Sequence, residues 1–171
     1  KRIICCIFGV RRIKLLNQMQ SKIAVKKLTD KITALENSMY EEFENGDKNV
    51  VVGNSNMFPL NHSFSEGVYI REMLMPKNGL IVGKIFKCSH HFILLKGKLL
   101  ITMPGEETKI YTAPSWFACK SNVRRVLLSL ENSVFMNILP NPDNETNIDI
   151  LEEKLLKDNY KDFKLNKELK Q

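Results

Sequence analysis

The chain has 171 residues, of which 43% are hydrophobic and 26% charged, enough apolar material for one globular domain with a buried core. Its net charge of +7 is unevenly placed, because residues 1–27 hold eight Lys or Arg and no acidic residue, which leaves 18 basic and 19 acidic residues, a sum of −1, for the rest. This excludes a basic nucleic-acid-binding domain beyond residue 27. Any contact with polyanions would be nonspecific and confined to residues 1–27.

The chain opens on an apolar run and contains four cysteines, at positions 5, 6, 88 and 119. No pair has the C-x-x-C spacing of a zinc knuckle, and an ordinary core needs no disulfide framework, so we expect a reducing compartment. Residues 3–10 are too few to span a bilayer and lack a small-residue cleavage site. We therefore expect neither a membrane anchor nor a secretory signal.

The segment 11–44 contains no proline or glycine and predicts a long helix that ends at Gly46. Its apolar residues fall in one narrow stripe, with steps of four, three, four and four. Such a stripe suits a coiled coil, so we expect the helix to form a homo-oligomer. The alternative is that the stripe packs on the chain's own β-structure. The stripe consists of Leu28, Ile32, Leu35, Met39 and Phe43.

Beyond residue 47 the chain alternates short β-rich runs with turn residues, as antiparallel hairpins do. The lack of interleaved helices excludes a parallel α/β fold. We predict a mainly β protein built on a small antiparallel jelly-roll β-barrel, because closing the sheet removes its exposed edges. The expected strands are 50–52, 68–74, 80–86, 91–95, 99–103, 109–112, 123–130 and 133–139.

A second helix is predicted near the C-terminus, where Asn147 has the side chain of an N-cap and Leu151, Leu155 and Leu156 could pack on the barrel. The predicted domain organisation is then an N-terminal basic, amphipathic helical segment over 1–46, the barrel over 47–146, and a C-terminal helix with a charged tail over 147–171.

Residues 57–160 resemble a cupin-family domain of the kind encoded by bacteriophages, with the N-terminal helix as an addition. The resemblance implies a jelly-roll barrel. It rests on Pro59-Leu60, His62, Phe64, Gly67-Val68-Tyr69, Arg71-Glu72, Met75-Pro76, Gly79, Gly83-Lys84-Ile85, His90, Lys96-Gly97, Ala113-Pro114 and the segment 143–147.

Metal-binding cupins hold the ion with two or three histidines and a glutamate, and the resemblance implies that most of these positions are replaced here. His90 falls in the glutamate slot, Phe86 stands where the related domains have an imidazole, and Arg124 falls near the slot of the last histidine. His91 neighbours His90 in a strand and must point to the opposite face. We therefore predict no metal and no cofactor, with His90 as the one remaining candidate ligand.

The other polar residues of the motif have ordinary structural explanations. We expect His62 at a turn or the surface; a metal at His90 would need help from His62 or Glu72. Arg71 and Glu72 read as a solvent-facing pair, although Arg71 and Arg124 together would make an anion site. Two further pairs are expected to be buried: Cys88 and Cys119 as small apolar residues, and Trp116 and Phe117 in the core or between subunits.

We therefore predict a noncatalytic structural or assembly protein, a virion or tail-associated component of a phage. It would be a homo-oligomer that docks on other phage structural proteins, in the virion or in the host cytoplasm during assembly. Two alternatives stay open. One is a metal-dependent cupin enzyme acting on a small molecule or sugar, and the other is a carbohydrate- or anion-binding cupin module.

Overall fold

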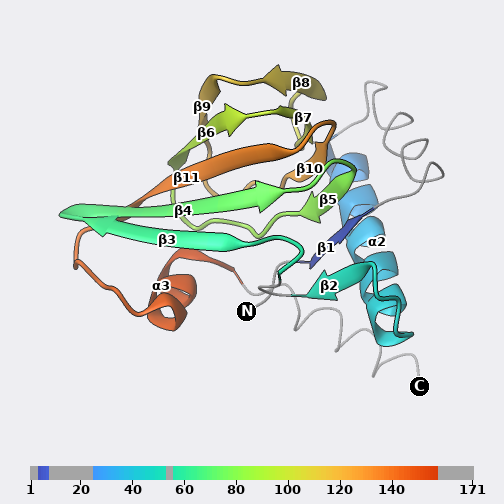
Figure 1. Cartoon of the computed structure of the whole chain (residues 1–171), viewed down its shortest axis with the longest axis horizontal. Helices are drawn as coiled ribbons and strands as arrows, with labels where there is room; N and C mark the ends of the chain where they lie inside the picture. The colour runs from blue at the N-terminus through green and yellow to red at the C-terminus, as the bar shows by residue number, and fades with distance from the viewer. Residues whose placement is uncertain (1–3, 8–24, 53–55, 158–171) are drawn as a thin grey trace.

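The computed structural model describes residues 4–7, 25–52 and 56–157, which form two antiparallel β-sheets and two helices (Figure 1). The six-stranded sheet has the order β2-β1-β5-β10-β7-β8 and the five-stranded sheet the order β3-β4-β11-β6-β9. The six-stranded sheet contains β1 (Ile4–Ile7), β2 (Val50–Val52), β5 (Gly79–Val82), β7 (Lys98–Thr102), β8 (Lys109–Thr112) and β10 (Val126–Ser129). The five-stranded sheet contains β3 (Leu60–Ser65), β4 (Gly67–Met75), β6 (His90–Lys96), β9 (Ser115–Cys119) and β11 (Ser133–Asn141).

From β4 onward the chain crosses repeatedly from one sheet to the other, so that β4, β6, β9 and β11 lie in one sheet and β5, β7, β8 and β10 in the other. This confirms the predicted mainly β, antiparallel fold. No β-ladder joins the two sheets within the described residues, so the observed arrangement is a sandwich of two sheets rather than the closed barrel that we expected.

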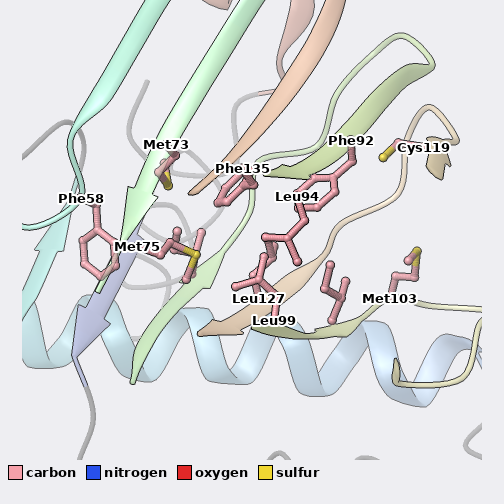
Figure 2. Packing of buried hydrophobic residues seen from close by; sticks show 12 residues of the cluster. Phe58, Met73, Met75, Phe92, Leu94, Leu99, Met103, Cys119, Leu127 and Phe135 are labelled. Carbon is pink, nitrogen blue, oxygen red and sulfur yellow. The ribbon is translucent and has the colours of Figure 1, made fainter. Parts of the chain in front are cut away.

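The space between the sheets is filled by large apolar side chains (Figure 2). Phe92 stacks on Phe117 and Phe135, with ring centroids 5.0 and 4.9 Å away. Because side chains alternate along a strand, β11 places Phe135, Asn137 and Leu139 inside while Val134, Met136 and Ile138 face outward. The same pattern in β4 turns Tyr69, Arg71, Met73 and Met75 inward.

Three strands were missed by the sequence analysis. β1 lies in the apolar run judged only as a membrane segment, yet it pairs with both β2 and β5. β3 and β9 are the two edge strands of the five-stranded sheet, and neither has a regular alternation of apolar and polar residues. The predicted domain organisation placed all of the β-structure within residues 47–146. β1 therefore corrects that boundary, because it adds a strand from residues 4–7 to the six-stranded sheet.

Helix α2 (Val25–Glu44) packs against the outer face of the six-stranded sheet. Four residues of its predicted stripe are buried there, together with Tyr40, whereas Phe43 remains 40% exposed. The sheet contributes Val50, Leu80, Val82, Leu100, Val126 and Leu128 to the same cluster. The helix ends as predicted, with Gly46 at φ 81° and its N–H bonded to the Phe43 carbonyl.

This packing corrects the coiled-coil interpretation. Leu28, Ile32, Leu35 and Met39 are at most 7% exposed within one chain, so the side chains offered for oligomerisation already face the sheet. An ion pair across the same contact, from Arg124 Nη1 to Glu36 Oε2 at 2.5 Å, holds the helix in place. The predicted start of the helix near residue 11 lies outside the described residues.

Helix α3 (Ile148–Leu155) confirms the predicted C-terminal helix. The Asn147 side chain accepts hydrogen bonds from the N–H groups of Asp149 and Ile150, which caps the helix. Leu151 and Leu156 are buried beside Tyr69, Phe86 and Leu139. A search of the described residues for helices finds none with the length and apolar character needed to cross a bilayer.

We expect Leu35→Ala to lower the free energy of unfolding by about 2–5 kcal/mol, because it opens a cavity between α2 and the sheet. Phe43→Ala, on the same stripe but exposed, should cost much less. Urea denaturation followed by circular dichroism measures both. Equal losses in the two variants would contradict packing within one chain.

Candidate functional site

A small cavity lies between the two sheets and is lined by both apolar and cationic side chains. Its volume is about 40 Å³, which is room for about three water-sized groups. The apolar part of the wall comes from Leu60, Met73, Ile81, Phe86, Phe92, Leu127 and Phe135. The polar part comes from Arg71, Lys84, Arg125 and Asn137, all at most 7% exposed.

Strand register brings Arg71 and Asn137 together at this cavity. They are paired residues of β4 and β11, and Asn137 is also paired with Phe92 of β6. Arg71 Nη1 lies 3.1 Å from Glu152 Oε1 of α3, so the C-terminal helix supplies a carboxylate to this cation. The expected surface pair of Arg71 and Glu72 is therefore wrong: Glu72 points outward, where it accepts a 2.8 Å hydrogen bond from Asn61.

Arg125 supplies a second buried guanidinium, and both of its hydrogen-bond acceptors are uncharged groups. Nη2 donates to His90 Nε2 at 2.8 Å, and Nη1 donates to Cys119 Sγ. Its Cζ lies 6.0 Å from the centre of the Phe86 ring. Burial lowers the pKa of Arg125, but a guanidinium keeps its proton in proteins. The site thus holds a full positive charge away from water.

His90 is neutral in this arrangement, and its hydrogen bonds fix its tautomer. Nε2 accepts from Arg125, so the proton lies on Nδ1, which faces the Cys88 carbonyl at 3.3 Å. Burial, followed by the charge of Arg125, lowers the pKa of His90 to about 4. Burial likewise raises the pKa of the Cys119 thiol, so neither partner of Arg125 carries charge at neutral pH.

The structure also corrects which arginine enters the interior. Arg124, placed near a ligand slot by the resemblance, points to the outer face and pairs with Glu36, whereas Arg125 occupies the cavity wall. The opposite orientation of His90 and His91 is confirmed, with His90 buried and His91 exposed. Cys119 is buried as expected, and Cys88 is half-buried.

His62 is neither at a turn nor free at the surface. It lies in β3, where its Nδ1 is 2.7 Å from the Tyr69 hydroxyl and its ring stacks on the same tyrosine. Burial and the charge of Arg71 lower the pKa of His62. Phe117 joins the core beside Phe92, but Trp116 is 72% exposed on the opposite face of β9.

The residues present do not fit the metal site that the resemblance to cupins implies. The lone pair of His90 Nε2 is already used by an N–H of Arg125, and that guanidinium would repel a cation. Glu72 cannot assist because it faces outward. Over the described part of the chain, no group of three or more His, Cys, Asp or Glu side chains is arranged to hold an ion.

Asn137 gives the cavity an unused acceptor. Its Oδ1 is buried and makes no hydrogen bond of good geometry among the described residues, although the amide lies beside His90 and acts to raise the pKa of that ring. An unpaired buried carbonyl costs about 1–3 kcal/mol, so the position favours a ligand that brings a donor. Sequence reasoning missed both Asn137 and Lys84 as site residues, because only the paired sheets show that these distant positions line one cavity.

Comparisons with known proteins add a fold-level likeness. No protein-family model and no curated sequence matches the chain. Among solved structures it resembles a cupin superfamily protein from Desulfitobacterium hafniense DCB-2 (TM-score 0.45, 10% identity, 53% of this chain and 83% of that one). It is also similar to an RmlC-like cupin with a double-stranded β-helix fold from Methanocaldococcus jannaschii (TM-score 0.42, 20% identity, 52% and 85%).

An acetylacetone dioxygenase from Acinetobacter johnsonii is similar at a comparable level (TM-score 0.41, 14% identity, 52% of this chain and 66% of that one). At these identities and TM-scores the likeness carries no argument about activity, and the structures named here give no link to a bacteriophage. Function has to be argued from the residues of the cavity.

The depressed pKa of His90 predicts a stability that falls with acid. Because the unfolded chain binds this proton near pH 6.5 and the folded chain only near pH 4, stability is complete above pH 6.5 and is lost as the pH falls toward 4. The loss is up to about 3 kcal/mol, or about 2 kcal/mol once solvent screening is allowed for.

Denaturation from pH 7 to pH 4 measures this loss. His90→Gln keeps an acceptor for Arg125 and should flatten the pH dependence relative to the wild type, whereas His91→Gln, at an exposed position, should leave it unchanged. Parallel curves for the wild type and His90→Gln would contradict the buried, neutral imidazole.

Proposed function

We propose that the protein is a noncatalytic binding module whose cavity takes a small hydroxylated anion. The observation that carries this proposal is the charge of Arg125, which is 6% exposed and has hydrogen bonds only to the neutral His90 and the thiol of Cys119 among the described residues. A buried charge without a counter-charge costs several kcal/mol. An anion in the adjoining cavity would offset that cost.

The rest of the cavity wall supports an anion of a particular kind. Lys84 adds positive charge to the wall, whereas Arg71 is paired with Glu152 of α3. A guanidinium binds carboxylates with paired N–H donors, so a carboxylate suits Arg125 well. A hydroxyl on the same ligand could donate a hydrogen bond to the unused Oδ1 of Asn137. A cavity of about 40 Å³ limits the ligand to the smallest hydroxy acids.

The cavity offers binding groups but no reactive constellation. His90 lacks a free basic nitrogen because Nε2 is engaged by Arg125, and burial raises the pKa of the Cys119 thiol. This favours the binding module over a metal-dependent cupin enzyme. Transition metal bound in stoichiometric amount after native purification, and lost in His90→Ala, would support the enzyme instead. The virion or tail role and its phage partners stay a prediction that neither the cavity nor the comparisons test.

Isothermal titration calorimetry at pH 7 tests the proposal with three matched small molecules. Glycolate carries both a carboxylate and a hydroxyl, acetate lacks the hydroxyl, and glycolamide lacks the charge. We expect glycolate to bind, acetate to bind about tenfold more weakly because Asn137 Oδ1 stays unpaired, and glycolamide to give no signal.

Two neighbouring arginines supply the control. Arg125→Gln removes the buried charge but keeps an amide donor for His90, and it should abolish glycolate binding without lowering the melting temperature. Arg124→Gln should keep glycolate binding while it weakens the contact with α2, because its partner is Glu36. Glycolate binding that survives in Arg125→Gln, or no binding of any of the three molecules to the wild type, would overturn the proposal.

A further inference from the structure

The outward face of the five-stranded sheet is apolar over most of its width. Alternate residues of four neighbouring strands meet there in register: Met136 of β11 is paired with Ile93 of β6, which is paired with Trp116 of β9. A second row joins Leu74 of β4 to Val134 of β11. We call this surface the open face; it consists of Ile70, Leu74, Ile93, Leu95, Trp116, Val134, Met136 and Ile138.

Nothing in the described part of the chain covers the open face. Helix α2 packs on the other sheet, along β1, β2 and β5, and α3 packs beside Tyr69 and Leu139, which point inward (Figure 1). Trp116 is 72%, Leu95 45% and Leu74 38% exposed. Apolar patches of this kind mark interaction sites, because single exposed apolar residues are common but contiguous rows are not.

The open face carries little charge for a chain with a net charge of +7. Its titratable groups are Glu72, which accepts a hydrogen bond from Asn61, together with His91 and Lys96, the second of which is paired with Val134. At one end the face continues into a groove of about 360 Å³ whose lining includes Leu74, Val134 and Lys96. An occupant must therefore be flat, mostly apolar and nearly uncharged.

We propose that the open face is the contact surface for a second copy of this chain, packed sheet against sheet. The same face on both copies satisfies the requirement for a flat, uncharged partner, and two-fold symmetry makes such a contact self-complementary. Two longer segments outside the described residues are alternatives within the chain, and both are more charged than the open face: seven of the 14 residues of 158–171 are Asp, Glu or Lys, and residues 8–24 carry four Lys or Arg.

The size of the face suits a weak dimer. The four strands that form it have nine, nine, seven and five residues, so at about 3.3 Å per residue and about 4.8 Å between strands the face covers about 480 Å². Stable interfaces bury about 800 Å² on each partner, and the projecting Trp116 and Leu95 add to the flat area. The dimer would use a surface that neither α2 nor the cavity occupies, so it stands or fails independently of the proposed anion binding.

The sole tryptophan of the chain, Trp116, is a built-in probe of this contact. We expect its fluorescence to shift to shorter wavelength as the concentration of the full chain rises from about 0.1 to about 100 µM, the weak end of the affinity range for such interfaces, while light scattering shows the mass doubling. The shift should persist in high salt, because the contact is apolar.

Variants at the centre of the open face and outside it decide the outcome. Met136→Lys keeps the probe and should give the mass of one chain with long-wavelength Trp116 emission at every concentration. If Met136→Lys does not fold by circular dichroism, Leu95→Lys, at an exposed position, serves the same purpose. Ile110→Lys, on the exposed edge strand β8 of the other sheet, should behave as the wild type.

Three results would overturn the proposal. A wild type with the mass of one chain and long-wavelength emission throughout would leave the face to a different partner. Short-wavelength emission that does not change with concentration would mean that the chain covers its own face. A dimer that survives both Met136→Lys and Leu95→Lys would lie on another surface.

Discussion

Two adjacent arginines, Arg124 and Arg125, connect the parts of this structure because successive residues of an extended segment point to opposite faces of a sheet. Arg124 reaches outward to Glu36 and holds α2 on the six-stranded sheet. Arg125 reaches inward to His90 and Cys119 and places a positive charge between the sheets. One extended segment thus fixes both the position of the helix and the electrostatics of the cavity.

The inward arginine also determines what His90 can do. A neutral imidazole with a free Nε2 is a good metal ligand, but here that nitrogen accepts a hydrogen bond from a permanent cation, which stabilises the neutral ring and disfavours a metal at once. The same contact explains why a histidine can be 5% exposed without a carboxylate partner. The fold keeps an interior polar cluster, and the sign of its charge suits anions rather than cations.

Much of this fold could be predicted from the sequence, and the failures have physical causes. Turn residues, the Asn147 cap and the Gly46 stop are local signals, and the structure confirms them. The inward arginine could not be assigned because the run around β10 is apolar on both faces: Val126 and Leu128 face α2, while Leu127 faces the interior. Without an alternation of polar and apolar residues, a shift of one residue leaves the pattern unchanged.

The prediction that the apolar stripe of α2 forms a coiled coil failed for a related reason. A row of apolar residues on a helix shows that something must cover it, but the row does not say whether the cover is a second helix or a sheet. The covering surface is formed by strands far apart in the sequence, including β5, β7 and β10, whose assembly is a tertiary event. The cavity residues Lys84 and Asn137 were missed on the same ground.

The two sheets therefore differ in what covers their outward apolar faces. In the six-stranded sheet, β5 and β10 are buried on both faces, because α2 lies outside and the second sheet inside. In the five-stranded sheet, β4 and β11 alternate buried residues with partly exposed ones, yet the partly exposed positions are mostly Val, Ile, Leu and Met rather than the polar residues that a solvated face normally carries. Trp116 extends this composition to the edge strand β9. A sheet face with the composition of an interior, over which the described residues place no helix, has the physical character of one half of an interface. This asymmetry between the sheets makes the open face a better candidate for assembly than α2.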